Sequence, residues 1–282
     1  MRFLILGYGT DCQGMAALCA DSLIRQGQPA DDITVWTDHP DWFKRRGCRV
    51  RELSAQTIAE WKGRYRFSLR LKILMMQEVF SSPPDGVQVF SDADIFWRGL
   101  PDVSGVEAGT TTLMHAYEPN FGADILRLYN EALAALYPGQ SFKMYNSGVL
   151  GFPRGLTVGQ INKVLRICDH VCDSLPRKME WAEQIGYSVV FQRDYRIQTV
   201  EQIAYHYWGY NQEIARLMRG KSLDEWATLS FEQLEHLNQQ AEALFNSPLY
   251  RWQNRIRKLQ RSWRKTRNQQ VARKHLRNIA GN

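Results

Sequence analysis

The sequence has no long hydrophobic run. It has 282 residues, of which 44% are hydrophobic, yet no apolar stretch approaches the roughly 20 residues that cross a bilayer. The first apolar run, at 3–6, is broken by Gly7 and Gly9, too early for the core of a signal peptide. A first buried strand explains this run better, and we expect a cytoplasmic protein.

Cysteine is also scarce. The five cysteines are odd in number and follow no regular spacing, which argues against a disulfide framework. Cys168, His170 and Cys172 share a short segment that suggests a metal cluster at first sight. The segment has a helical pattern, however, in which residue i+2 points away from i and i+4. We therefore interpret Cys168 and Cys172 as buried, unreactive thiols.

Acidic residues are missing from the C-terminal segment. Residues 246–282 contain eleven Lys and Arg and no Asp or Glu. The first 245 residues hold the other 25 basic residues and all 29 acidic ones, a net charge of −4 in a chain of net charge +7. We therefore expect a folded domain over 1–245 and a basic helical tail over 246–282, joined by the Asn-Ser-Pro linker at 246–248.

Within 1–245, short apolar runs alternate with helical patterns. Such alternation is typical of an α/β fold in which helices cover both faces of a mostly parallel sheet. Strands are predicted at 2–8, 33–37, 48–53, 87–91, 110–115 and 144–152. Helices are predicted from the first strand to about 26, and at 65–80, 158–175 and 231–245, the last opened by Ser230. The runs 187–191 and 204–207 read as short apolar pieces in a loop-rich region.

Two carboxylates stand at the end of one predicted strand. Asp92 and Asp94 follow the apolar run 87–91, and the carboxyl end of a strand in an open α/β sheet faces the ligand crevice. Residues i and i+2 of an extended chain project to the same side. Carboxylate oxygens suit Mg²⁺ or Mn²⁺, and such an ion can bridge a diphosphate and offset the charge that develops as the diphosphate leaves.

The Asp-x-Asp pattern alone leaves other readings open. Two solvated turn aspartates would give the same tripeptide. A phosphatase of the haloacid-dehalogenase type also carries Asp-x-Asp after a strand, but usually on the first strand of the domain, whereas Asp92 lies well inside this chain. A Mg²⁺-dependent phosphatase or nucleotidyltransferase is the first alternative. A non-catalytic adaptor that binds membrane or nucleic acid through its basic tail is the second.

Several segments, in this order, resemble GT-A-fold glycosyltransferases over roughly residues 3–215. The closest resemblance is to glycosyltransferase family 8, which includes glycogenin and the bacterial lipopolysaccharide galactosyl- and glucosyltransferases. The matching segments are LGYGT at 6–10, Lys72, Asp92-Ala93-Asp94, YNSGVLGF at 145–152, Glu183-Gln184 and HYWG at 206–209.

The resemblance implies a retaining, metal-dependent transfer of a hexose from a nucleotide-diphosphate sugar, of which a UDP-sugar is our first choice. The acceptor would be a glycan or a lipid-linked or lipopolysaccharide molecule, as in polysaccharide biosynthesis. The implied metal ligands are Asp92, Asp94 and His206. The implied donor-binding residues are Tyr8, Gly9, Thr10, Lys72, Asp92, Ala93, Asp94, Asn146 and Ser147. The implied catalytic residues are Asp92, Asp94, Asn146, Glu183 and Gln184.

The chain departs from the family pattern at two positions. Gln212 stands where the family usually has a diphosphate-contacting lysine, for which Arg216 or Lys221 would have to substitute. Glu183 replaces the usual aspartate and is longer by one methylene. This second change bears on sugar specificity more than on the class of reaction.

The basic tail has an amphipathic pattern. The apolar residues Trp252, Ile256, Leu259 and Trp263 recur at helical spacing. They lie among eleven basic residues. An Arg-rich helix with Trp on its apolar side suits an anionic membrane surface. We therefore predict peripheral binding to the inner face of a membrane through 250–279. Docking on the enzyme's own body or on a second subunit is the alternative, and nucleic acid ranks last.

Overall fold

The computed structural model describes residues 1–82, 84–118, 123–176, 179–248 and 250, and these divide between two compact units. The first unit comprises Met1–Trp208 and Gly220–Leu229, and the second comprises Gly209–Arg219 together with the chain from Ser230 onward. The basic tail predicted at 250–279 lies, except for Tyr250, outside the described residues. No helix within the described ranges is both long enough and apolar enough to cross a membrane.

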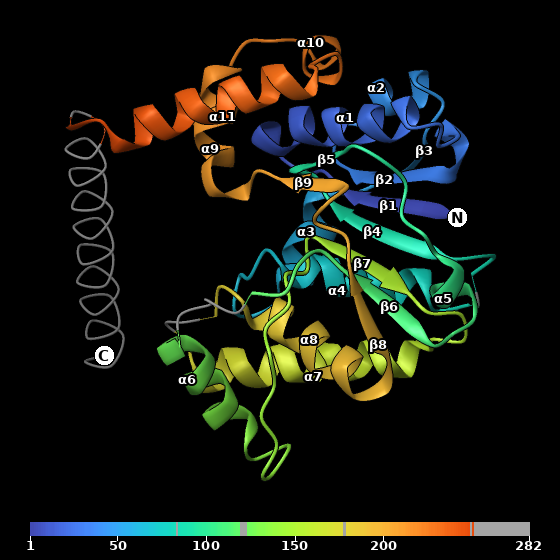
Figure 1. Cartoon of the computed structure of the whole chain (residues 1–282), viewed down its shortest axis with the longest axis vertical. Coiled ribbons are helices and arrows are strands. Elements are labelled where there is room, and N and C mark those ends of the chain that lie inside the picture. Colours follow the sequence, from blue (N-terminus) through green and yellow to red (C-terminus); the bar gives the residue numbers. More distant parts are fainter. Residues whose placement is uncertain (83, 119–122, 177–178, 249, 251–282) are drawn as a thin grey trace, which may run out of the picture. The chain divides into compact units, whose positions relative to one another are not determined.

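The first unit is built on a seven-stranded sheet with the order β3-β2-β1-β4-β7-β6-β8 (Figure 1). All its strands run parallel except β7, which is antiparallel to both of its neighbours. The strands are β1 Arg2–Leu6, β2 Ile33–Thr37, β3 Arg49–Glu52, β4 Gln88–Asp92, β6 Thr111–Met114, β7 Val149–Phe152 and β8 Arg196–Thr199. The predicted α/β fold with a mostly parallel sheet is therefore confirmed.

Helices cover both faces of this sheet. One face carries α1 (Thr10–Arg25), which packs on α10 (Leu223–Ala227), and the other carries α4 (Arg70–Val79), α7 (Val158–Ser174) and α8 (Ala182–Asp194) (Figure 1). The connecting segments contain further helices, namely α2 (Asp41–Arg45), α3 (Ala55–Lys62), α5 (Ser104–Glu107) and α6 (Ala123–Leu133). Because both faces are covered, the central strand β1 is buried on both sides, and its Phe3, Leu4 and Ile5 are all apolar and buried.

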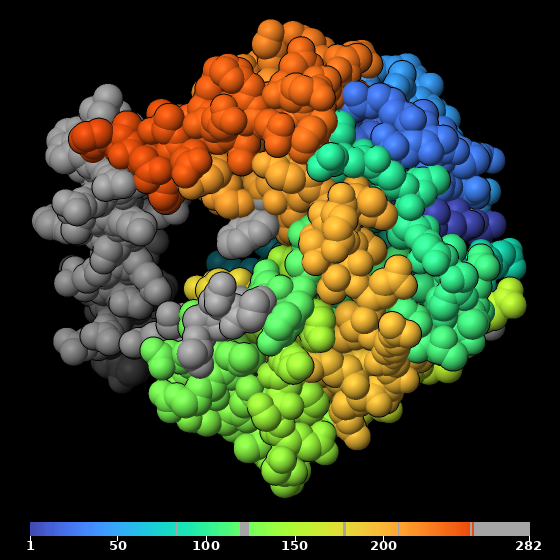
Figure 2. Space-filling model, viewed as in Figure 1, coloured from blue at the N-terminus to red at the C-terminus, as the bar shows by residue number. Residues whose placement is uncertain are grey.

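The strand pairing also explains how distant segments come to the same surface. Thr111–Met114 of β6 pairs in register with Arg196–Thr199 of β8. On the face seen in Figure 2, the gold residues around β8 accordingly border the teal-green residues around β6.

Three predicted elements differ from the observed ones. The helix predicted at 65–80 begins only at Arg70, because the chain turns at Arg66, whose φ of 53° is not helical. The strand predicted at 144–152 is regular only from Val149. The run 187–191, read as an apolar piece in a loop, lies inside α8.

A second, two-stranded sheet places the last predicted site residue. Strand β5 (Ile95–Trp97) pairs antiparallel with β9 (Ala204–His206), and Ile95 lies opposite His206. The pairing holds the end of β9 beside the turn that follows Asp92. The run 204–207, read from the sequence as an apolar piece in a loop-rich region, is thus mostly a strand and is a fourth difference from the prediction.

The second unit is helical where it is described. Helix α11 (Phe231–Asn246) opens with the predicted Ser230 cap, which forms a capping box with Gln233, and packs on α9 (Asn211–Leu217). The buried Tyr250 hydroxyl donates to Glu213 and accepts from Arg216. Tyr250 is therefore part of this unit and lies beyond the predicted linker.

Candidate active site

The candidate site lies at the edge of the sheet where the parallel strands β1 and β4 end. Leu6, the last residue of β1, pairs with Asp92, the last residue of β4. Because β7 runs antiparallel, its beginning meets the end of β4, and the Asp92 N–H donates to the Gly148 carbonyl over 2.7 Å. The segment 145–148 and the Asp-x-Asp segment are thus brought together by sheet topology alone.

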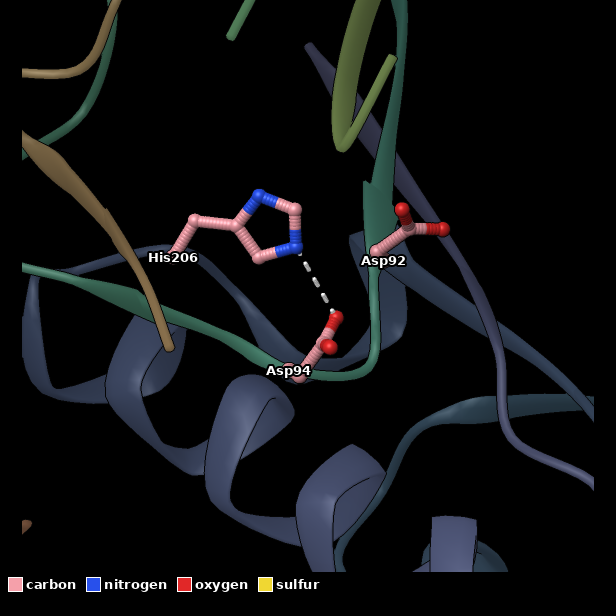
Figure 3. A group of neighbouring side chains, drawn as sticks. All are labelled: Asp92, Asp94 and His206. Carbon is pink, nitrogen blue, oxygen red and sulfur yellow. Dashed lines mark ion pairs between the residues drawn. The ribbon is translucent and has the colours of Figure 1, made fainter. Parts of the chain in front are cut away.

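Asp92, Asp94 and His206 form a group that could hold a metal ion. One ligand atom from each residue lies within 4.8 Å of the others. The His206 Nε2 and Asp94 Oδ1 atoms are 3.3 Å apart, and both side chains are nearly buried. Figure 3 shows the imidazole pointing from β9 toward Asp94, whereas the Asp92 carboxylate extends from β4 on the side away from both in this view.

The geometry and chemistry of this group fit a divalent ion. Neighbouring ligands around an octahedral ion, with bonds of about 2.1 Å, lie about 3 Å apart, close to the 3.3 Å between Asp94 and His206. Two carboxylates with one imidazole suit Mn²⁺ and also suit Mg²⁺ if further oxygens come from substrate. The three residues would bind the ion, and their net charge would help to retain it.

A second histidine, which the sequence did not suggest, supports His206. The ring of His115 lies edge-to-face against His206 with a centroid separation of 5.0 Å. The His115 Nε2 lies 2.8 Å from the Ala204 carbonyl, to which it donates in the matching tautomer. Burial and the neighbouring imidazole lower the pKa of His115 to about 4. A neutral His115 beside the group adds no positive charge to compete with a cation.

Lys72 lies deep in the site. Its side chain is 2% exposed, and Nζ is 3.1 Å from Asp92 Oδ1 and 3.2 Å from Glu183 Oε1. The ammonium also donates to the Ser147 carbonyl over 3.0 Å. Burial opposes its charge, but Asp92 and Glu183 outweigh burial, so the pKa of Lys72 is raised. The lysine predicted to touch the donor therefore bridges two carboxylates in this structure.

Glu183 is the most deeply buried carboxylate of the site. Its side chain is 1% exposed, and its Oε2 accepts a hydrogen bond of 3.0 Å from the Ser147 hydroxyl. Burial raises the pKa of Glu183 to about 7, although Lys72 opposes the shift. The carboxylate of this glutamate therefore contacts Lys72 and is shielded from solvent.

A further carboxylate, Glu118, joins the two predicted amide residues. Its Oε1 accepts from the Asn146 side-chain amide and its Oε2 from the Gln184 side-chain amide, each over 2.8 Å. The Asn146 Oδ1 accepts from the Gly148 N–H over 2.8 Å. Asn146 and Gln184 are therefore fixed in place, and Glu118 adds a partly buried negative group to the polar wall.

The loop that follows β1 is fixed by a carboxylate that directly follows β2. Both oxygens of Asp38 accept from the Gly9 N–H, at 3.0 and 3.1 Å. Gly9 has a φ of 79°, which favours glycine. Lys62 lies over the ring of Tyr8 at 5.2 Å, and burial raises the pKa of Tyr8. Thr10 begins α1 and is exposed.

The two substitutes considered for the family lysine are both engaged elsewhere. Arg216 donates to the Tyr250 hydroxyl and lies 3.6 Å from Glu213. Lys221 pairs with Glu225 at 2.8 Å.

Sequence reasoning did not find Asp38, His115 or Glu118. Asp38 directly follows β2, so the rule that strand carboxyl ends face the crevice would have pointed to it. His115 directly follows β6 and carries the same signal. Glu118 lies in irregular chain beyond β6, where no periodicity or strand end marks it.

No family model and no curated protein matches this chain. Solved structures do match it, among them the apo form of mouse xyloside xylosyltransferase 1, with 9% sequence identity and a TM-score of 0.41. That match covers 71% of this chain and 84% of the mouse chain. A likeness at this level does not reveal the activity of this chain, so the functional argument rests on the residues of the site.

Proposed function

We propose that this protein is a metal-dependent glycosyltransferase that moves a hexose from a nucleotide-diphosphate sugar, with a UDP-sugar as the first candidate, to a glycan or lipid-linked acceptor. The observation that carries the proposal is the convergence of Asp92, Asp94 and His206 at the carboxyl edge of a parallel sheet. This edge is where open α/β sheets bind ligands, and the three residues belong to segments with the family's motif order.

The bound metal would neutralise the diphosphate as it leaves. Asp92, Asp94 and His206 hold their ligand atoms within 4.8 Å of one another and would orient the ion on the β4 side of the crevice. Lys72 is held between Asp92 and Glu183, where its positive charge opposes the rise that burial causes in the pKa of Asp92 and its contacts fix the position of that carboxylate. Its proposed role is therefore to position Asp92, and contact with the donor is secondary.

The neighbouring residues fit the recognition of nucleotide and sugar. The loop of Tyr8, Gly9 and Thr10 lies next to the end of β4 and is fixed by Asp38, so it can receive the nucleoside. Asn146 and Gln184 are aligned by Glu118. Amide and carboxylate groups held in this way can donate to and accept from sugar hydroxyls. Retention of anomeric configuration remains part of the proposal through the family resemblance.

We propose that the enzyme works at the inner face of a membrane, with the basic segment 250–279 as its contact. The support is the sequence alone: eleven Lys and Arg without Asp or Glu in 246–282, arranged around a Trp-containing apolar stripe. A lipid-linked acceptor would require the enzyme to work at such a surface.

The first test is calorimetric titration of UDP into the full chain with Mn²⁺ and then with EDTA. We expect a binding event that appears only with the metal and is lost in Asp94→Asn, with little change in the unfolding midpoint. The matched control is Asp31→Asn, which makes the same chemical change at an exposed residue on the opposite edge. Binding that is equal in both variants would contradict the proposed metal site.

Product analysis separates the reaction classes. With UDP-sugar and Mn²⁺, release of UDP supports transfer or slow donor hydrolysis. Release of inorganic phosphate or pyrophosphate from nucleotides would instead indicate the phosphatase or nucleotidyltransferase alternative. If no nucleotide binds with metal, the catalytic proposal fails and the adaptor alternative stands.

A further inference from the structure

A second concave surface lies at the opposite edge of the same sheet. It is a cavity of about 710 Å³ beside the amino ends of β1 and β4, a size within the range of small-molecule sites. Arg2 and Gln88, which pair at those strand beginnings, line it. Gln88 and Asp92 lie four steps apart along β4, at about 3.3 Å per step, so the cavity is about 13 Å from the candidate metal group.

The cavity wall is a sheet face that α4 leaves partly uncovered. In the β2–β3 register, Thr34 pairs with Arg49 and Trp36 pairs with Arg51. Paired residues and residues i, i+2 share one face of a sheet, so these four side chains stand on the same face. All four line the cavity, and Val79 of α4 borders it.

This wall is rich in hydrogen-bond donors that have no acceptor. Arg49 and Arg51 form no ion pair with any described residue, and both are exposed. The Thr34 hydroxyl likewise has no hydrogen-bond partner within the described ranges, and the buried indole N–H of Trp36 has no acceptor there. Two uncompensated guanidinium groups on alternate residues of one strand repel each other, and an anion between them would relieve that repulsion.

The other charged residues of the cavity determine which wall an anionic group would bind. Arg2 lies 3.9 Å from Asp32 and 4.0 Å from Asp85, so its charge is partly balanced. Glu78 and Asp85 stand on the wall formed by the end of α4 and the following turn. An anionic group would therefore be drawn to the β3 wall and held away from the α4 wall.

We infer that this cavity binds the phosphate group of a small soluble molecule, such as a phosphate ester or a diphosphate, through Arg49, Arg51 and Thr34. Phosphate accepts only, carries two negative charges and matches the guanidinium fork. A concave site of this size favours a soluble ligand over a flat bilayer surface. The inference is independent of the metal site and of the proposed transfer reaction.

The test is calorimetric titration of inorganic pyrophosphate into the full chain in EDTA, which removes any contribution from metal at Asp92 and Asp94. We expect saturable binding of one pyrophosphate per chain. Arg49→Ala with Arg51→Ala should weaken it by roughly tenfold or more, because two charge-assisted contacts are lost. Arg49→Lys with Arg51→Lys should weaken it less, because the charge is kept without the fork.

The matched control is Arg166→Ala with Arg196→Ala, the latter on β8 at the other edge of the sheet. Both are exposed arginines without an ion pair to the described residues, so this variant removes the same charge from other surfaces. Its affinity for pyrophosphate should stay within about twofold of the original, as expected for distant, screened charges. The unfolding midpoint of each variant verifies that it is folded. An absence of saturable binding, or an equal loss in both alanine pairs, would overturn the inference.

Discussion

Gly148 lies against both Asp92 and His206 of the candidate metal group. Its carbonyl accepts the Asp92 N–H over 2.7 Å, which fixes one ligand. A Cβ at this position would lie 2.7 Å from His206 Cε1 and 2.9 Å from Nδ1, a closeness that real atoms do not tolerate. The absence of a side chain therefore allows His206 to reach Asp94.

We expect Gly148→Ala to weaken Mn²⁺ binding by about tenfold or more, since displaced ligands and their supports commonly cost this much. Mn²⁺ titration followed by electron paramagnetic resonance measures it directly and requires no substrate. Gly159→Ala is the control, because a Cβ there meets nothing closer than 3.4 Å. Unchanged Mn²⁺ affinity in Gly148→Ala would show that His206 is not a ligand.

The burial of Glu183 predicts a pH dependence of stability. Its pKa is about 7 in the folded chain against an ordinary 4.5. Between these values the folded state binds more protons than the unfolded state, so the contribution of Glu183 to the free energy of unfolding falls as pH rises. The fall is at most about 3.5 kcal/mol, at 1.4 kcal/mol per unit of pKa.

The measurement is urea unfolding of the original chain and of Glu183→Gln at about pH 5 and about pH 8. Glutamine does not titrate, so the stability of the original chain relative to this variant should fall between the two pH values. The control is Glu107→Gln, at an exposed position of α5. Its difference in unfolding free energy from the original chain should be the same at the two pH values. If the difference in unfolding free energy between the original chain and Glu183→Gln is the same at both pH values, the buried carboxylate ionises normally.

Some of these residues could be predicted from sequence and others could not. Asp92 and Asp94 were identifiable because an apolar strand ends at them, and strand ends have a fixed place in a parallel sheet. His206 was suggested only by family resemblance, since its partner strand β5 is far away in sequence. Glu118 depends on two side chains from elsewhere in the chain, and no local pattern encodes such a contact.

At the scale of elements, the close approach of α1 and α10 is decided by one glycine. A Cβ at Gly14 would lie 2.4–2.5 Å from three atoms of the Trp226 indole ring, and Trp226 is buried. Gly14 lies inside α1, where alanine would otherwise be favoured by about 1 kcal/mol. The two effects oppose each other, and the clash with a buried ring is the larger.

Gly14→Ala should therefore destabilise the chain by about 1–3 kcal/mol, the usual cost of overpacking. Chemical unfolding of Gly14→Ala beside Gly159→Ala measures it, because both are helical glycines and only Gly14 faces a ring. Gly159→Ala should be neutral or stabilising. If Gly14→Ala were also stabilising, α10 would not pack on α1 as described.

The elements that were predicted well are those with one buried face. Helices α7 and α11 show a clear apolar period and have capping boxes at Thr157 and Ser230. Helix α8 was missed because ten consecutive residues from Ala182 to Phe191 are buried. A helix that is buried all round shows no amphipathic period, so its apolar part resembled a strand.

At the scale of the whole chain, the distribution of charge divides the sequence into an acidic part and a basic C-terminal part. The first 245 residues carry −4, whereas 251–282 hold all eleven basic residues of the C-terminal segment. The predicted boundary at 245/246 stays a prediction. Tyr250 is buried against Glu213 and Arg216 of the second unit, so a cut after Phe245 would also damage that unit. A truncation after Tyr250 keeps these contacts and therefore tests the tail alone.

Truncation after Tyr250 should abolish flotation with vesicles that contain anionic lipid and leave the unfolding midpoint nearly unchanged. Each Lys or Arg near an anionic surface contributes about 1 kcal/mol, so binding by the full chain should also weaken steeply with salt.

The full chain with Trp252→Ser and Trp263→Ser keeps every charge and tests the apolar stripe separately. Loss of flotation in both variants would support insertion of an amphipathic helix, because electrostatic attraction alone would survive the Trp changes. If the truncated chain floats as well as the full one, membrane contact does not involve 251–282.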